Sequence, residues 1–381
     1  MTAASTSSSP ARNAYIDTLR GWSIFGVVCI HFAGSFVTAD TYAWSPSFWL
    51  GLILNQGFIF AVPLFVFLSG YLAASSSKRP SLGDYYASRL TRIGLPYLLV
   101  SVLSFFLLNH YAEWQALPDA GAKASWLLRR VLFTGVEPTL YFIPLILQLY
   151  LLQPALRALP GWLSRLAPAL GERRLVVILT GLLLALHLTL GVLCYRSTLD
   201  YYTWGRPNVL FWMFYFFAGL HFRSLTATIT PRQADLAFRG AVGVALAAMA
   251  WNFYHLSNRS VVGQHFERNL LDFAYVRPEM LAYDLAVVLA GATGLLRAWS
   301  VRPSLASFLG RHTLEIYLWH ILVLYYGAWR YADALANCRQ VPEVIVVICA
   351  ATAIIIAAAK EVWDRAKIYL QTHRLELVKT P

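Results

Sequence analysis

The stretch GWSIFGVVCIHFAGSFVT, residues 21–38, contains no Asp, Glu, Lys or Arg. A helix needs about 20 mostly apolar residues to cross the hydrocarbon core of a bilayer, because each residue advances it by about 1.5 Å. The run is longer than the apolar part of a signal peptide, and removing it would invert the orientation of every later loop. The stretch therefore predicts a transmembrane helix.

Further apolar stretches follow along most of the chain and predict an all-α, polytopic membrane bundle of about ten helices. This bundle would occupy residues 12–367, with a C-terminal tail at 368–381. Residues 1–11, rich in Ser, Thr and Ala, predict a disordered tail. The other nine predicted spans are 50–74, 94–110, 139–158, 175–194, 207–222, 240–256, 279–297, 305–327 and 342–359.

Composition and charge agree with a lipid-facing protein. Hydrophobic residues make up 58% and charged residues 13% of the chain, whereas soluble proteins carry about 25% charge. The net charge of +12 comes without long basic runs, so we expect no nucleic-acid partner. Of the 31 Lys and Arg, 21 fall in alternate loops or in the adjoining ends of the predicted spans, which predicts that both termini are cytoplasmic.

Arg20 and His31 are the most informative polar pair. They are eleven positions apart, which is three helical turns plus about 20°, so both lie on one helix face, ~16 Å apart along the axis. Arg20 would lie at the cytoplasmic headgroups, where a guanidinium can bind phosphate, and Asp17 would orient it. His31 would lie near mid-membrane in the same groove, as a general base or a nucleophile. A snorkelling Arg and a structural His are the alternative.

Arg89 and Arg92, in SRLTRIGLPY at 88–97, form a second basic site. They are i, i+3 neighbours on one helical face at the predicted cytoplasmic boundary. A pair of guanidinium groups there could bind the phosphates of coenzyme A. Ordinary positive-inside topology explains the same pattern.

Other polar residues at membrane depth are candidates for an acceptor site or a pocket wall, since such residues usually face the bundle interior. We select Ser69, Tyr71, Asp284, Glu315 and His320. Ser69 and Gly70 form a small pair that also favours close helix packing. Glu315 and His320 are five positions apart and need not touch.

Several enzyme classes lack support in this sequence. There is no GxSxG elbow, Walker loop, HExxH or GxGxxG motif, and no Cys/His cluster has zinc-ligand spacing. We therefore expect no metal site and no bound cofactor.

Together the motifs resemble the acyltransferase-3 family of membrane acyltransferases. The pieces run in family order through most of the chain, and the spacing of Arg20 and His31 is specific when joined to the others. They are IDTLRGWSIFGVVCIH (16–31), PLFVFLSGYL (63–72), RLTRIGLPY (89–97), LYFIPLILQLY (140–150), FYFFAGLHF (214–222) and HTLEIYLWH (312–320).

The resemblance implies a ten-span bundle in the bacterial inner membrane that uses acyl-CoA as co-substrate. We expect acetyl-CoA as the donor, and the apolar groove could also take a succinyl or a longer group. Family acceptors are glycans and other hydroxyl compounds. The family's Arg and His carry over to Arg20 and His31, and its RxxR pair to Arg89 and Arg92. Its fourth-span motif usually reads Leu-Trp-Phe-Leu, so Tyr141 departs from it and could alter the pocket wall.

Some relatives add an SGNH esterase-like domain, which this sequence lacks. Either the bundle completes the transfer or a separate periplasmic partner does. The competing interpretation is a transporter or flippase, which shares the spans and buried charges but needs no acyl-CoA. A non-catalytic scaffold would tolerate alanine at both Arg20 and His31.

Overall fold

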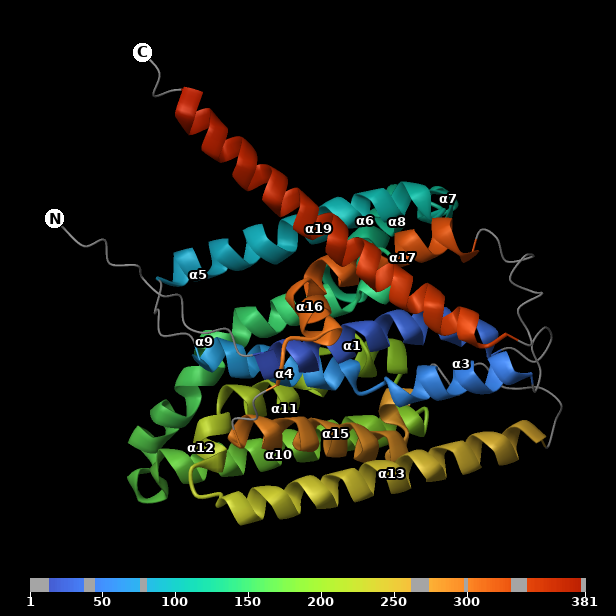
Figure 1. The fold of residues 1–381 in the computed structure, drawn as a ribbon. Helices are drawn as coiled ribbons and strands as arrows, with labels where there is room; N and C mark the ends of the chain where they lie inside the picture. Colours follow the sequence, from blue (N-terminus) through green and yellow to red (C-terminus); the bar gives the residue numbers. More distant parts are fainter. Residues whose placement is uncertain are drawn as a thin grey trace.

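A computed structural model describes residues 14–37, 45–75, 81–261, 274–297, 301–329 and 341–377. Within these ranges the chain is helical and contains no strand, which confirms the predicted all-α bundle (Figure 1). The predicted tail at 1–11 lies outside the described residues. The final helix continues to Leu377, so residue 368 falls inside a helix.

The longer helices lie roughly side by side (Figure 1). The α-helices, long and short, are α1 (Ala14–Ala33), α3 (Pro46–Gly57), α4 (Ala61–Ser75), α5 (Leu82–Arg89), α6 (Leu95–Leu107), α7 (His110–Gln115), α8 (Ala120–Arg129), α9 (Phe142–Leu166), α10 (Gly171–Tyr195), α11 (Val209–Leu220), α12 (Phe222–Thr226), α13 (Pro231–Val261), α15 (Pro278–Leu296), α16 (Leu305–Arg311), α17 (Thr313–Gly327) and α19 (Glu343–Leu377). Short 3-10 or π segments are η1 (Gly34–Phe36), η2 (Leu90–Gly94), η3 (Arg130–Thr134), η4 (Pro138–Leu140), η5 (Pro168–Leu170), η6 (Tyr201–Gly205) and η7 (Ala274–Val276).

Within the described residues, eight helical segments are long and apolar enough to cross a membrane. They are Ala14–Phe36, Pro46–Ser75, Leu82–Leu107, Pro138–Leu166, Pro168–Tyr195, Pro231–Leu256, Pro278–Leu296 and Glu343–Gln371. Two of the ten predicted spans fall short of this length. The stretch at 207–222 forms α11, which has 12 residues. The stretch at 305–327 divides at His312 into α16 and α17.

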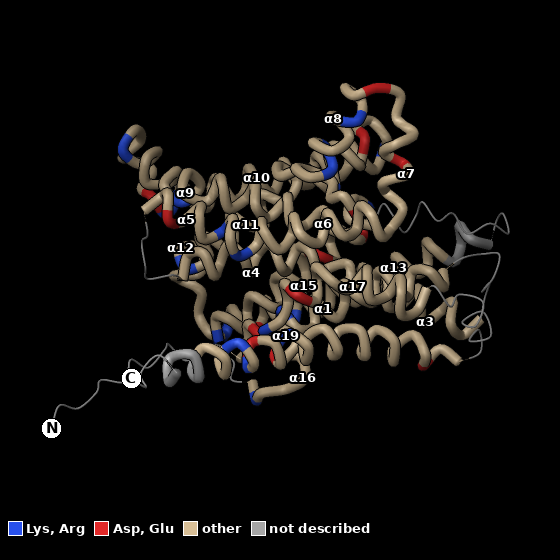
Figure 2. The backbone as a smooth tube through the Cα atoms, turned by 90° about the horizontal axis from the view of Figure 1, so that it is seen from above, with Lys and Arg blue, Asp and Glu red and all other residues tan. Residues whose placement is uncertain are grey.

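Charged residues lie mainly toward the two ends of the bundle, and both basic and acidic residues gather around α7 and α8 (Figure 2). The middle is left largely uncharged, as a hydrocarbon environment requires. This distribution and the eight long helices describe a multi-pass membrane protein. We name the two ends by the residues of α1 that point to them, the Arg20 end and the His31 end.

Glycines allow two helix pairs to approach until their backbones touch. A Cβ on Gly70 of α4 would lie 2.1 Å from the Phe216 carbonyl oxygen, and one on Gly219 of α11 would lie 2.0 Å from the Phe67 carbonyl oxygen. Between α1 and α16, Gly21 faces the backbone of Ala306 in the same way. Small residues permit such crossings in membranes, where close packing replaces the hydrophobic effect as the driving force. The predicted packing role of Gly70 is thus confirmed.

His110 connects the α7–α8 hairpin to the loop before α9. It is buried, its Nε2 lies 2.9 Å from Glu137 Oε2, and its Nδ1 lies 3.4 Å from Glu113 Oε2. The hydrogen bond with Glu137 is the main reason that the pKa of His110 is raised above its ordinary value, and burial opposes this shift. The charged imidazole therefore stabilises this junction.

We expect this junction to weaken with rising pH. Because the folded-state pKa is raised, the stabilisation is fully present below the unfolded pKa of about 6.5 and is lost as the pH rises through the folded value. The melting temperature of the wild type should fall between about pH 6 and about pH 8, and that of His110→Gln should fall less. Equal pH dependence of the two proteins would contradict this assignment.

Candidate functional site

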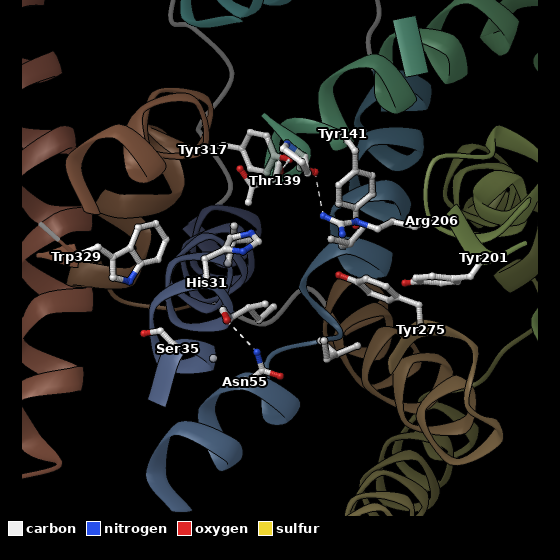
Figure 3. A pocket seen from close by; sticks show the side chains of 16 residues that line it. His31, Ser35, Asn55, Thr139, Tyr141, Tyr201, Arg206, Tyr275, Tyr317 and Trp329 are labelled. Atoms are coloured by element: carbon white, nitrogen blue, oxygen red, sulfur yellow. Dashed lines mark hydrogen bonds between the residues drawn. The ribbon is translucent and has the colours of Figure 1, made fainter. Parts of the chain in front are cut away.

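Two cavities lie inside the bundle, one toward each end of α1. The cavity at the Arg20 end has a volume of about 500 Å³, and its wall includes Arg20, Arg89, Arg92 and Ser69. The cavity at the His31 end has a volume of about 630 Å³ (Figure 3). We call them the arginine cavity and the histidine cavity.

The arginine cavity brings together the three cations that the sequence selects as a phosphate site. Arg20 is 27% exposed, and its Nη1 lies 3.9 Å from Asp17 Oδ1, the orienting contact that the spacing predicts. The Arg89 guanidinium lies over the ring of Tyr150 at 4.3 Å. Arg92 is exposed. The guanidinium groups of these three arginines therefore give the cavity a cationic wall.

A π-helical segment joins α5 to α6 at this wall. It runs from Leu90 to Gly94, so it begins directly after Arg89 and contains Arg92. π-helical segments are rare in proteins, and those that occur are frequently found at functional sites. They change the angular spacing along the helix, so the i, i+3 geometry expected for a regular α-helix does not apply unchanged here.

One of two stacked imidazoles, that of His31, lines the histidine cavity. His31 is half-buried and lines the cavity, and the ring of His320 lies against it with centroids 5.3 Å apart and an interplanar angle of 29°. His320 Nδ1 lies 2.7 Å from the Tyr317 carbonyl oxygen. Since a carbonyl only accepts, Nδ1 donates, and a neutral ring then has its lone pair on Nε2. Among the described residues this buried Nε2 has no hydrogen-bond partner.

Tyr317 of α17 belongs to the wall of both cavities. Its hydroxyl donates to the Thr139 carbonyl oxygen at 2.5 Å and accepts from the Phe142 amide at 3.3 Å. The side chain is therefore fixed between the arginines and the imidazoles. The sequence predicts one continuous groove along α1, whereas the structure has two neighbouring cavities, because a side chain from a distant helix separates them.

Sequence comparison decides the family. A profile described as an acyltransferase domain, that of the acyltransferase-3 family, matches residues 13–360, nearly the whole chain. This chain belongs to the acyltransferase-3 family.

Among curated proteins, this chain is similar to glucans biosynthesis protein C of Salmonella typhi and of Salmonella typhimurium. Each match is 28% identical over 117 residues. The matched stretch covers 28% of this chain and 30% of each relative. No solved structure matches the chain.

The other candidate residues divide between the two cavity walls and the surrounding helix packing. Tyr141 lines the histidine cavity, and Ser69 lines the arginine cavity. Tyr71 packs against Phe222 with ring centroids 5.7 Å apart.

Two acidic candidates lie away from both walls. Glu315 Oε1 lies 3.8 Å from Lys360 Nζ on α19. Asp284 is buried on α15 and is absent from the two cavity walls. The pattern of polar residues at membrane depth did not separate these packing positions from the cavity.

Sequence reasoning missed several residues of the histidine cavity. Arg206, Tyr201 and Tyr275 come from the segments η6 and η7 and from the turn before α11. The sequence placed these segments in loops outside the membrane. A usable signal was the aromatic run YYTW beside Arg206, because aromatic rings and Arg are typical of carbohydrate and anion sites.

Proposed function

We propose that this protein is a membrane acyltransferase that takes its acyl group from a coenzyme A thioester, such as acetyl-CoA, and transfers it to a carbohydrate hydroxyl. The observation that carries the proposal is the adjacency of the two cavities. The arginine cavity, with three arginines in its wall, lies beside the histidine cavity, whose wall includes His31. Among the residues that line them, Tyr317 alone belongs to both.

The donor would bind with its phosphates in the arginine cavity. Arg20, Arg89 and Arg92 offer several N–H donors, and guanidinium groups bind phosphate in bidentate fashion. The pantetheine arm is of similar length to the ~16 Å rise between Arg20 and His31 along α1. The thioester would pass Tyr317 to reach His31, which requires a rearrangement of that side chain.

The transfer step needs a base at the acceptor hydroxyl. His31 takes the hydroxyl proton while the oxygen attacks the thioester carbonyl carbon, so that a C–O bond forms and the C–S bond breaks. The leaving thiolate takes the proton back and coenzyme A departs as a thiol. In the covalent variant His31 first accepts the acyl group and then passes it to the acceptor. The stacked His320 would position the His31 ring in either route.

A glycan acceptor is supported by the similarity to proteins named for glucan biosynthesis. The tyrosines of the histidine cavity suit sugar rings, since they combine an apolar face with a hydroxyl. With the predicted basic loops inside, the arginine cavity would open toward the cytoplasm of a bacterial inner membrane, where acyl-CoA is present.

The donor site is tested by removing two of its cations. We expect the double variant Arg89→Ala/Arg92→Ala to bind acetyl-CoA at least roughly tenfold more weakly, because each hydrogen bond to a charged group contributes about 1.5–3 kcal/mol. Isothermal titration of the purified protein in nanodiscs measures this. The matched control is Arg223→Ala/Arg232→Ala, which removes two exposed arginines outside the cavity.

Equal dissociation constants for the two double variants would reject the phosphate site. A transporter predicts a different result, namely that acetyl-CoA neither binds nor stabilises the wild type.

A further inference from the structure

Arg206 is a cation at the centre of the histidine cavity that the transfer step leaves without a role. It follows η6, and its side chain enters the cavity near Tyr141, Tyr201 and Tyr275 (Figure 3). Its guanidinium lies over the Tyr141 ring at 4.2 Å, and Nη2 donates to the Pro138 carbonyl oxygen at 2.9 Å. These two contacts hold the Arg206 guanidinium on the side of the cavity opposite His31 (Figure 3).

No carboxylate balances this charge within the part of the chain that the structure describes. None of the ion pairs found there includes Arg206, and its Nε is buried with no hydrogen-bond partner. Glu137, on the neighbouring loop, is engaged by His110 and Thr139. Arg206 is half-buried, and a cation without a counter-charge is costly there, because part of its hydration is lost without compensation. An anion that enters the cavity would supply the missing partner.

The lining offers further donors for such an anion. The hydroxyl of Tyr141 is buried and has no hydrogen-bond partner among the described residues, and a phenol can donate to a carboxylate or phosphate oxygen. Guanidinium and phenol together would form a charge-assisted site, in which hydrogen bonds are about twice as strong as between neutral groups.

A side cavity gives a second access to Arg206. It has a volume of about 390 Å³, shares Pro138, Tyr141 and Arg206 with the histidine cavity, and is also lined by Trp126, Arg129 and Arg130. Arg130 is partly engaged, since its Nη2 lies 3.8 Å from Glu113 Oε2. The route from α8 to Arg206 is therefore basic and aromatic, which favours an anionic substrate over a neutral one.

We propose that Arg206 binds an anionic oxygen group of the substrate, a carboxylate or a phosphate, and thereby selects which molecule reaches His31. This inference rests on the proposed function, and it adds the chemical class of the substrate. The anion belongs either to the acceptor, as in an acidic sugar, or to the far end of the acyl group, as in a dicarboxylic acyl chain. In both cases Arg206 holds the charge while the reacting atoms lie near His31.

The first experiment measures anion binding without any transfer. Succinate and its neutral diamide are added to the wild type, Arg206→Gln, Arg206→Lys and Arg89→Ala/Arg92→Ala in nanodiscs, and thermal stability is recorded. We expect succinate, but not the diamide, to stabilise the wild type. Arg206→Gln should lose this shift, Arg206→Lys should keep part of it, and the double variant should keep it. An equal succinate shift in the wild type and Arg206→Gln, or none in the wild type, would overturn the proposal.

The second experiment finds where the anion resides. One arm compares binding of succinyl-CoA and acetyl-CoA, and the other compares release of coenzyme A with glucuronic acid and with glucose as acceptors. A roughly tenfold preference for succinyl-CoA that Arg206→Gln removes assigns the anion to the acyl group. A roughly tenfold preference for glucuronic acid that Arg206→Gln removes assigns it to the acceptor. No preference in either arm argues against the proposal. If acyl-CoA does not bind at all, the proposed function fails, and the succinate result still decides whether Arg206 binds an anion.

Discussion

Replacing His31 with alanine should reduce acyl transfer by roughly 10²–10⁴-fold in kcat, the usual contribution of a positioned general base. The imidazole faces the histidine cavity, and no other described histidine lines that wall. Binding of acetyl-CoA should change little, because the phosphate site lies in the arginine cavity. Release of coenzyme A at saturating donor and acceptor measures kcat, and titration measures the dissociation constant.

The control for this loss is His255→Ala on α13, whose ring packs against Trp251 with centroids 4.8 Å apart, away from both cavities. It should insert and turn over like the wild type.

His320→Ala tests the second ring. If the two imidazoles act as a unit, the double variant His31→Ala/His320→Ala should be no slower than His31→Ala alone. A His31→Ala protein with nearly wild-type turnover and normal insertion would show that the base lies elsewhere.

Replacing Gly219 with valine should prevent the bundle from folding. A Cβ at this position would lie 2.0 Å from the Phe67 carbonyl oxygen and 2.9 Å from the Tyr71 amide nitrogen, so the collision is with backbone that cannot rotate away. Overpacking usually costs about 1–3 kcal/mol when side chains can adjust, and here α4 and α11 would have to separate along their length. We expect no monodisperse protein, or a melting temperature far below that of the wild type.

Gly243→Val on α13 is the matched control, since nothing lies within 4 Å of a Cβ built at Gly243. It should insert and melt like the wild type. Gly219→Ala is the milder test. Where it still folds, it should weaken acetyl-CoA binding, because α4 carries Phe65, Leu68 and Ser69 to the arginine cavity. A stable Gly219→Val protein would show that the two helices do not cross this closely.

The sequence predicted the placement of candidate side chains correctly where the residues concerned lie close together along one helix. Arg20 and His31 share α1, so the helical repeat alone places their side chains on one face. Arg89 and Arg92 are three positions apart and both line the arginine cavity, although the π-helical segment changes their angular spacing. Tyr71, Glu315 and Asp284 show the limit of this reasoning. A polar residue at membrane depth can equally meet a ring, a lysine from another helix or the packed core, and the pattern along one helix does not distinguish these.

The sequence by itself determined that this protein is an all-α membrane bundle, because hydropathy over about 20 residues is a property of each segment alone. In two places the predicted span is longer than the helix that forms. There α11 and the broken α16–α17 pair are largely enclosed by other helices, so their length need not match the thickness of the bilayer.

Only the tertiary structure decided what the site contains. The stacking of His31 on His320, the position of Tyr317 between the cavities and the entry of Arg206 from a loop all join segments far apart in the chain. Such contacts depend on how closely helices approach, and backbone contact at glycines such as Gly70 and Gly219 sets that distance. Spacing along a single helix carries no information about it.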